Sequence, residues 1–415
     1  MTTATGRRER LSFLFLNVGH FLDHLFTLVF ATVAALALSR EWGMTYAQLV
    51  PYATPGFVAF GLFSLPAGRL ADRWSRHGMM VVFFIGIGLA SIAAGFARSP
   101  LQMSVMLFFV GVLAAIYHPV GLAMVVDTAR ASSTGLAIGI NGVWGNLGVG
   151  CAALVTGWFI DHGGWRSAFI VPGVLSVLIG LAYWWHVHAD IAAAGQPKPK
   201  AATASAQGTM TSDARATYLR LTAIVFFTTA VSSLVFQSTT FALPKVFDER
   251  LGGIAGSATL VGWLAFVVFA VASLAQLLVG SMLDRYGPRR VFMGAATMQL
   301  VFFAIMPGLQ NWWALAVALG FMLGAFGQIP INDYMIGKMA KSELRATVYG
   351  VRYIVSFSVL AAALPLIAFI HGSYGFDTLF RVLAAAAAAI LAAVSLLPHR
   401  LPEADAAPPA SAARA

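Results

Sequence analysis

The sequence predicts an all-α integral membrane protein with twelve transmembrane helices arranged in two pseudo-symmetric six-helix bundles. Three observations lead to this prediction. Hydrophobic residues make up 59% of the 415 residues and charged residues only 10%, whereas a typical soluble domain is roughly 25% charged. Apolar runs long enough to cross a bilayer recur along the chain. The two halves of the chain also carry the same residues at a nearly constant spacing.

The apolar runs predict the individual spans. A helix that crosses the hydrocarbon core of a bilayer needs about 20 predominantly apolar residues. Runs of this kind, bounded by charged residues or by Gly and Pro clusters, predict spans at 12–38, 49–71, 79–97, 101–126, 134–160, 166–187, 218–244, 257–283, 290–308, 311–337, 345–370 and 376–398.

The positions of the basic residues predict the orientation of these spans. With the N-terminus in the cytoplasm, 19 of the 26 Lys and Arg residues fall on the cytoplasmic side, as the positive-inside rule requires. The formal net charge of +10 therefore reflects topology, and we expect no nucleic-acid partner. The first run is too long for a cleaved signal. We expect a multi-pass protein of the bacterial inner membrane with both termini in the cytoplasm.

Changes in composition divide the chain into two bundles. Residues 196–217 are rich in Ala, Ser, Thr, Pro and Lys and contain no long apolar stretch, which is typical of a flexible linker. The last residues are similarly low in complexity. We expect an N-terminal bundle at 1–190, a cytoplasmic linker at 191–217, a C-terminal bundle at 218–400 and a disordered tail at 401–415.

An internal repeat relates the two bundles. Three residues of one loop recur 212 positions later, and three further features recur 211 positions later. The pairs are Gly68 and Gly280, Asp72 and Asp284, Arg73 and Arg285, Pro119 and Pro330, Gly139 and Gly350, and the segments 164–169 and 375–380. A constant offset at three separate places predicts parallel repeats related by an axis along the membrane normal.

The loop after the second span carries a family resemblance. Its sequence, GRLADRWSR at 68–76, resembles the G-x-L-A-D-R-x-G-R signature of the major facilitator superfamily, and residues 280–290 repeat the pattern. Ser75 stands where the family usually has glycine, and Gly287 keeps the glycine in the second copy. Together with twelve spans and a basic central linker, the resemblance covers essentially the whole chain.

The resemblance implies a conformational gate. Glycines in such loops let neighbouring helices approach closely, and the aspartates can accept charge-assisted hydrogen bonds that form in one state and break in another. By resemblance, Asp72, Arg73 and Asp127 would hold the outward-open state. The predicted gate residues are Gly68, Asp72, Arg73, Asp127, Gly280, Asp284 and Arg285.

The fifth span allows two interpretations. Its glycine-rich sequence at 139–150 resembles the antiporter motif of the family, although Asn146 stands where the motif usually has proline after Gly145. Glycines at this density also suit close packing of helices. Both interpretations stay open.

Polar residues on one face of the first span predict a functional site. At 100° per residue, Asn17, His20, Asp23 and His24 fall within about a third of the helix circumference. Ionisable groups at membrane depth are costly, so this face is expected to turn toward the bundle interior or a water-filled cavity. In the major facilitator fold, the first, fourth, seventh and tenth helices line that cavity.

The fourth span adds Tyr117 and His118 to this face. Counted at about 1.5 Å per residue from the span midpoints, His118 and His20 both lie about 6 to 8 Å toward the cytoplasm. Imidazoles beside a carboxylate can gain and lose a proton near neutral pH. A static hydrogen-bonded network is the alternative. The seventh span offers Gln237 but no charge, so proton chemistry is expected in the N-terminal half.

The tenth and eleventh spans carry Gln328, Asp333 and Arg352. Arg352 is the one arginine deep in a predicted span, and a guanidinium without a counter-charge would be severely penalised there. Either Asp333 or a substrate anion neutralises it. The predicted substrate- and proton-binding residues are Asn17, His20, Asp23, His24, Tyr117, His118, Gln237, Gln328, Asp333 and Arg352.

Other classes of site are not expected. Imidazole and carboxylate are good zinc ligands, but no cysteine joins them and Cys151 is the only cysteine of the chain, so we expect no metal and no cofactor. The sequence contains no phosphate-binding loop and no G-x-S-x-G motif. We therefore expect neither direct ATP drive nor an enzyme.

These observations predict a secondary active transporter that works by alternating access. Its YHP sequence at 117–119 and its glycine-rich fifth span loosely resemble the fosmidomycin-resistance and drug-efflux branch. This favours proton-coupled export of a small, in some cases anionic, organic compound by a monomer in the lipid bilayer. The alternatives are proton-coupled uptake of a small carboxylate or similar nutrient, with Arg352 as its anion clamp, and a non-transporting membrane sensor or assembly factor.

Overall fold

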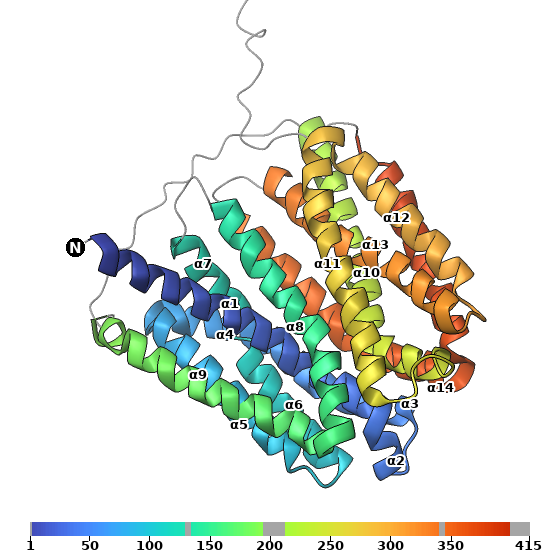
Figure 1. Cartoon of the computed structure of the whole chain (residues 1–415). Coiled ribbons are helices and arrows are strands. Elements are labelled where there is room, and N and C mark those ends of the chain that lie inside the picture. Colours follow the sequence, from blue (N-terminus) through green and yellow to red (C-terminus); the bar gives the residue numbers. More distant parts are fainter. Residues whose placement is uncertain (1, 129–133, 194–211, 340–344, 399–415) are drawn as a thin grey trace, which may run out of the picture.

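The computed structural model describes residues 2–128, 134–193, 212–339 and 345–398. These residues form helices joined by short turns and contain no β-strand (Figure 1). Most of the predicted linker, at 194–211, and the predicted tail at 401–415 lie outside the described residues. The all-α fold class is confirmed.

The N-terminal half contains the six predicted spans, several of which are built from more than one helical element. They are α1 (Thr2–Val33) with the π-helical turn η1 (Ala34–Leu38) and α2 (Ser39–Glu41); α3 (Tyr46–Leu49), the 3₁₀ turn η2 (Val50–Ala53) and α4 (Thr54–Arg73); α5 (Arg76–Gly95); α6 (Pro100–Ala114), the π-helical turn η3 (Tyr117–Gly121) and α7 (Leu122–Thr128); α8 (Thr134–Gly163); and α9 (Trp165–Ala193).

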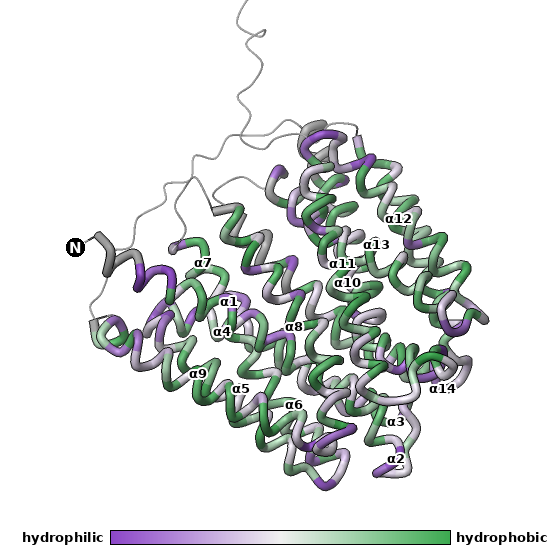
Figure 2. The backbone as a smooth tube through the Cα atoms, in the orientation of Figure 1, coloured by the Kyte–Doolittle hydropathy of each residue, from purple (hydrophilic) through white to green (hydrophobic). Residues whose placement is uncertain are grey.

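The C-terminal half has fewer and longer elements. They are α10 (Ser212–Arg250), α11 (Ala258–Tyr286), α12 (Pro288–Ile305), α13 (Asn311–Met339) and α14 (Arg345–Ser395). Hydrophobic residues run along most of each helix, and hydrophilic residues are more frequent toward the helix ends and loops (Figure 2). Large apolar side chains such as Leu62, Leu178 and Phe369 are exposed, as expected of a surface that faces acyl chains.

Ten helical stretches of the described residues are long and apolar enough to cross a membrane. One of them belongs to α14, which Gly375 divides into two helices, and α12 is not among the ten. The predicted ninth, eleventh and twelfth spans are thus present as helices at their predicted places. The count of twelve membrane crossings itself stays a prediction.

The repeat of the sequence coincides with a repeat of the backbone. Gly164 ends the turn between α8 and α9 with φ +77°, and Gly375, 211 positions later, breaks α14 with φ +75°. An L-residue is strained at such a φ. The same special backbone angle therefore recurs at the junction of the last two spans of each half.

The two signature loops differ from each other. Gly287 between α11 and α12 has φ +77°, whereas Ser75 between α4 and α5 has an extended backbone with φ −166°. The Ser75 hydroxyl accepts a hydrogen bond from the Gly78 N–H at 3.1 Å and so caps α5. The first loop therefore accommodates a serine where the second needs a glycine.

Candidate functional site

Asp23 of α1 lies at the centre of the predicted polar cluster. Its side chain is completely buried, and its Oδ2 lies 3.4 Å from Nε2 of His118 in the turn η3. No described group makes a hydrogen bond to either carboxylate oxygen. A buried carboxylate in this position needs a compensating positive charge close by. A proton on the carboxylate or on the His118 imidazole would supply it.

The π-helical turn η3 brings His118 to this cluster. Pro119 has no backbone N–H, so it cannot continue the regular α-helical hydrogen bonds between α6 and α7, and the chain forms a wider turn over Tyr117–Gly121. Turns of this kind interrupt helices often at functional sites. Here the turn places Tyr117 and His118 toward α1.

Three histidines pack together, and one of them, His118, lies beside the carboxylate. The ring centroids of His20, His24 and His118 lie 5.0 to 5.6 Å apart. The His20 ring stacks on Tyr117 at 4.9 Å with an interplanar angle of 20°. A Cβ added to Gly145 of α8 would lie 2.6 to 2.8 Å from three atoms of the His20 ring. That glycine leaves the room in which the imidazole sits.

Asn141 of α8 connects the elements of the cluster. Its carbonyl oxygen accepts a hydrogen bond from His20 Nδ1 at 2.8 Å, which places the hydrogen on Nδ1 and leaves the lone pair on Nε2. The Asn141 amide donates to Asn17 Oδ1 at 3.0 Å and to the Tyr117 hydroxyl oxygen at 2.9 Å. The Tyr117 hydroxyl donates to the Leu16 carbonyl at 2.8 Å.

Asn141 is absent from the residues predicted as site residues. It is buried in an apolar span, and that alone could have identified it as a candidate. Its position within the glycine-rich run drew attention to packing instead.

The glycines of the fifth span do pack helices closely. A Cβ at Gly148 would lie 2.2 Å from the carbonyl oxygen of Phe21 in α1, so the backbones of α1 and α8 touch there. Gly145 likewise allows the His20 ring to lie close to α8. The packing interpretation of this span is confirmed, and a role as an antiporter motif stays a prediction.

The three histidines form a set that could hold a metal ion. One ring nitrogen from each of His20, His24 and His118 lies within 4.8 Å of the other two. His20 and His24 are four residues apart, which is the spacing of metal-ligand pairs on helices. Imidazole nitrogens suit divalent transition metals such as zinc. The sequence predicts that no metal is bound, and this stays a prediction. Because the three histidines could bind a metal ion, the prediction is worth testing.

Arg352 and Asp333 form an ion pair in the C-terminal half. Nη1 of Arg352 in α14 lies 2.5 Å from Oδ1 of Asp333 in α13. The arginine side chain is 12% exposed and the aspartate side chain 41% exposed, so the pair is more open on the Asp333 side. The internal pair, one of the two predicted alternatives, is present, and a substrate role for Arg352 stays a prediction.

The two predicted glutamines lie apart from these groups. Gln328 is buried between α12 and α13, where its amide donates to Gln299 Oε1 at 2.6 Å. Gln237 of α10 is half-buried. The structure therefore brings together six of the ten predicted residues in one cluster and two in the ion pair.

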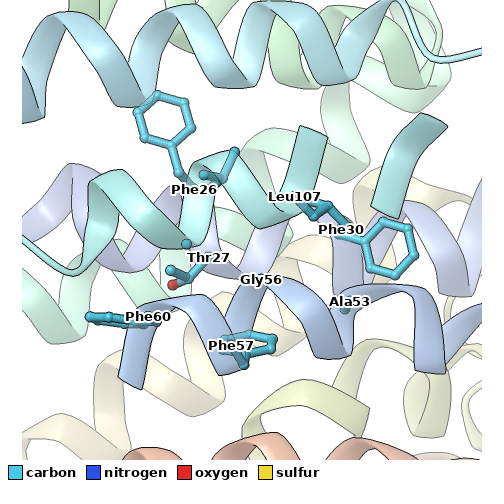
Figure 3. A pocket seen from close by; sticks show the side chains of 10 residues that line it. Phe26, Thr27, Phe30, Ala53, Gly56, Phe57, Phe60 and Leu107 are labelled. Atoms are coloured by element: carbon cyan, nitrogen blue, oxygen red, sulfur yellow. The ribbon is translucent and has the colours of Figure 1, made fainter. Parts of the chain in front are cut away.

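Figure 3 shows a small apolar pocket, which Phe60 connects to the histidine cluster. Its lining comes from α1, α4, α6 and the turn η2, and the Phe60 ring lies 5.7 Å from the His118 ring. With the open space at its mouth it encloses about 290 Å³. The lining residues are Phe26, Thr27, Phe30, Ala53, Gly56, Phe57, Phe60, Leu107, Val110 and Gly111. An aromatic or aliphatic group would find apolar contacts there.

In the N-terminal half, the ion pairs of the predicted gate differ from the expected ones. Arg76 bridges the two aspartates, with Nη1 2.5 Å from Asp127 and Nη2 3.0 Å from Asp72. Arg73 makes no ion pair within the described residues. Gly68 does allow a close approach, because a Cβ there would lie 3.3 Å from Cβ of Pro119.

Among the residues that the structure describes, the C-terminal copy of the gate shows no matching contacts. The expected close approach at Gly280 is wrong, since no described atom lies within 4 Å of a Cβ placed there. Close contact between α11 and α13 occurs instead at Gly327, where a Cβ would lie 3.2 Å from Val279. Asp284 and Arg285 are exposed, and Arg285 lies over the Tyr286 ring.

Bacterial transport proteins have sequences similar to this chain. The chain is 25% identical to a gallate transporter of Pseudomonas putida over 282 residues, which span 62% of this chain and 62% of that protein, less than two thirds of its length. It is 25% identical to the multidrug resistance protein MdtG of Salmonella arizonae over 321 residues, or 76% of this chain and 77% of that protein.

Solved structures share the fold. A bacterial homologue of the human lysosomal transporter Spinster, in an inward-facing and unoccupied conformation, superimposes with a TM-score of 0.68 at 16% identity and covers 94% of both chains. The sequence model of the Major Facilitator Superfamily matches residues 16–253 and 225–415. The chain is a multi-pass membrane protein that belongs to the major facilitator superfamily of transporters.

Proposed function

We propose that this chain is a proton-coupled secondary transporter of the bacterial inner membrane that exports small organic compounds, including anionic ones, by alternating access. Both termini would lie in the cytoplasm, as the distribution of Lys and Arg indicates. Alternating access is the rocking of two six-helix bundles around a central site. The substrate and protons would be its partners, and a monomer would suffice.

The position of Asp23 carries the proposal of proton coupling. The carboxylate is buried at membrane depth, with one imidazole 3.4 Å from Oδ2 and two more in ring contact with that imidazole. A static network would be expected to satisfy such an oxygen with hydrogen bonds, yet none is made to either oxygen by the described residues. A carboxylate whose compensating charge can arrive and leave is suited to carry a proton.

The length of the alignment with one relative favours export. The alignment with MdtG, which is named a multidrug resistance protein, spans 77% of that protein, against 62% for the gallate transporter. The pocket beside His118 has an apolar lining, and it would have to open further to admit the hydrophobic part of an organic compound. Neither observation depends on the direction of the proton flux.

Uptake of a small carboxylate is the second candidate. The similarity to a gallate transporter favours it, and Arg352 is available as a bidentate partner for a carboxylate. In this version, the substrate anion would replace Asp333 beside the guanidinium during the cycle.

A proteoliposome experiment tests both versions. Vesicles with an acidic interior are supplied with external gallate or with a cationic fluorescent drug, and accumulation is followed with and without the pH gradient. An antiporter accumulates substrate as protons leave, whereas a symporter expels it, and this sign does not depend on the orientation of the protein. Accumulation by the wild-type protein that is lost in Asp23→Asn supports the proposal. Flux unaffected by that substitution would remove Asp23 from the coupling.

A further inference from the structure

A contact between the two halves lies far from the histidine cluster, at the opposite end of the bundle from the chain terminus at Thr2. We refer to this as the outer end, and to the end that carries the N-terminus as the inner end. Here α8 of the N-terminal half meets the start of α11 of the C-terminal half, and Figure 1 shows the two helices side by side.

The backbones of α8 and α11 touch at the outer end. A Cβ at Gly157 would lie 2.2 Å from the carbonyl oxygen of Ala258, and a Cβ at Gly262 would lie 2.5 Å from that of Ala153. Any larger side chain at either glycine would force the two halves apart. The two glycines, one from each half, therefore make the tight seam between the bundles.

The same helices approach each other less closely at their inner ends. No described atom lies within 4 Å of a Cβ placed at Gly139 or Gly142 of α8, or at Gly280 of α11. The close backbone approaches between α8 and α11, at Gly157 and Gly262, thus lie in the outer half of each helix. In alternating access, a seam of this kind must open when the protein turns its site outward.

A charged hydrogen bond closes this seam. Oδ2 of Asp161, near the end of α8, accepts from the Thr259 N–H at 2.7 Å and from the Thr259 hydroxyl at 2.5 Å. Thr259 belongs to the first turn of α11, where backbone N–H groups have no partner within the helix. A carboxylate is favoured there by the helix dipole as well as by the hydrogen bonds.

Contacts between aromatic rings also cross the outer end. The Tyr46 ring of α3 packs edge-on against the His371 ring of α14, and the Phe57 ring of α4 packs against Phe241 of α10. Contacts of this kind are adaptable in geometry, since the rings can slide. The two hydrogen bonds from Thr259 to the Asp161 carboxylate are directional, and they are lost once the helices separate.

We propose that Asp161 and Thr259 form the clamp that keeps the outer end closed, so that breaking this pair shifts the transporter toward its outward-open state. The clamp differs from the predicted gate, because that gate lies at the inner ends of α4, α7 and α11. It concerns the conformational equilibrium of the protein and would hold whichever substrate or coupling ion the transporter uses.

The test measures how often the outer end opens. Thr240 is 3% exposed and lines a small pocket shared by Ala153 of one half and Phe269 of the other. A cysteine placed there by Thr240→Cys, in a Cys151→Ser background, would be reached by an impermeant maleimide from the outer side only when the seam opens. The labelling rate then follows the population of the open state.

Asp161→Asn is expected to raise this labelling rate about tenfold, since the charge of both hydrogen bonds is lost. Thr259→Val is expected to raise it by a smaller factor, since the backbone N–H of residue 259 still donates to Oδ2. The double variant should label no faster than Asp161→Asn alone, because both substitutions remove one interaction. Thr259→Ser keeps the hydroxyl and should behave like the parent protein.

Asp377→Asn provides a matched control. Asp377 also accepts hydrogen bonds at the outer end, from Arg250 at 2.5 Å and from the Gly308 N–H at 3.1 Å, but both partners belong to its own half. Its substitution should leave the labelling rate unchanged. Unchanged rates in both Asp161→Asn and Thr259→Val, or an equal rise in Asp377→Asn, would overturn the proposal.

Discussion

The imidazole of His20 lies in a slot between Tyr117 and Gly145. Its ring stacks on the tyrosine at a centroid distance of 4.9 Å, and a Cβ placed at Gly145 would come within 2.6 Å of its Nε2. The slot fixes the ring while the Asn141 carbonyl fixes its Nδ1 hydrogen. Three elements, α1, η3 and α8, thus determine how one histidine presents its remaining nitrogen to the cluster.

Gly145→Ala is expected to reduce gradient-driven transport at least tenfold, because a methyl group over the ring displaces His20 from this slot. Gly142→Ala is the control, since it lies one turn earlier in α8 and no described atom is near its Cβ. It should change transport less than about twofold, as expected of a substitution that adds no clash. Initial rates in proteoliposomes at equal protein content make the comparison. Equal losses of transport in Gly145→Ala and Gly142→Ala would contradict a role of Gly145 in positioning the His20 ring.

Gly375→Ala is expected to lower the melting temperature of the detergent-solubilised protein. Its φ of +75° and ψ of 178° belong to a region that only glycine occupies without strain, and an alanine there costs on the order of 1 to 3 kcal/mol. Gly294→Ala is the control, because Gly294 lies inside α12 with no described atom close to its Cβ. That substitution should raise stability slightly. A melting temperature in Gly375→Ala equal to the parent value would refute the strained turn.

Arg352→Gln is expected to destabilise the protein, because it leaves Asp333 partly buried without its counter-charge. The double variant Asp333→Asn with Arg352→Gln should recover most of the lost stability, as both charges are then absent. Thermal unfolding of the single and double variants measures this coupling. A double variant as unstable as Arg352→Gln would show that the pair does not stabilise the fold.

The same variants test Arg352 as an anion clamp. In a folded double variant, transport of gallate should fall at least tenfold while transport of a cationic drug persists, if the guanidinium binds the substrate carboxylate. Equal transport of both probes would confine Arg352 to a structural role.

Chelation is expected to leave transport unchanged. The sequence predicts no metal, and the coupling proposed here uses only protons at the histidine cluster. Transport is measured after treatment with EDTA and after addition of zinc. Loss of transport on chelation that zinc restores would mean that His20, His24 and His118 hold a functional ion.

Much of the fold follows from hydropathy and repetition. The predicted span at 79–97 corresponds to α5 at Arg76–Gly95, and the predicted spans at 345–370 and 376–398 meet at the kink of Gly375. Such agreement arises because a bilayer imposes a minimum apolar length on every helix. Turn residues and charges then mark where each helix ends.

Side-chain partners were harder to predict, because they depend on how helices rotate against each other. The face of α1 was predictable from its period of 3.6 residues, and it does meet His118. The role of Asn141 was not, since one asparagine among many glycines gives no period. Arg76, rather than Arg73, bridges Asp72 and Asp127, because it starts the next helix, four residues after Asp72.

The prediction of a close approach at Gly280 was wrong for a similar physical reason. Sequence repeats predict equal local turns but not equal surroundings, and the close backbone approaches of α11 to α8 lie toward its outer end. A glycine that is crowded in one conformation of the two bundles can therefore be open in another.

Substrate-driven proton movement tests the central claim most directly. Proteoliposomes with a trapped pH dye receive a gradient of a transported compound without an imposed pH gradient, and the internal pH is recorded. In the wild-type protein, movement of the substrate is predicted to change the internal pH, and Asp23→Asn is predicted to abolish that change. Asp190→Asn is the control: it removes a surface ion pair with Arg8 and is predicted to keep the pH change. Undiminished proton movement in Asp23→Asn would contradict the account.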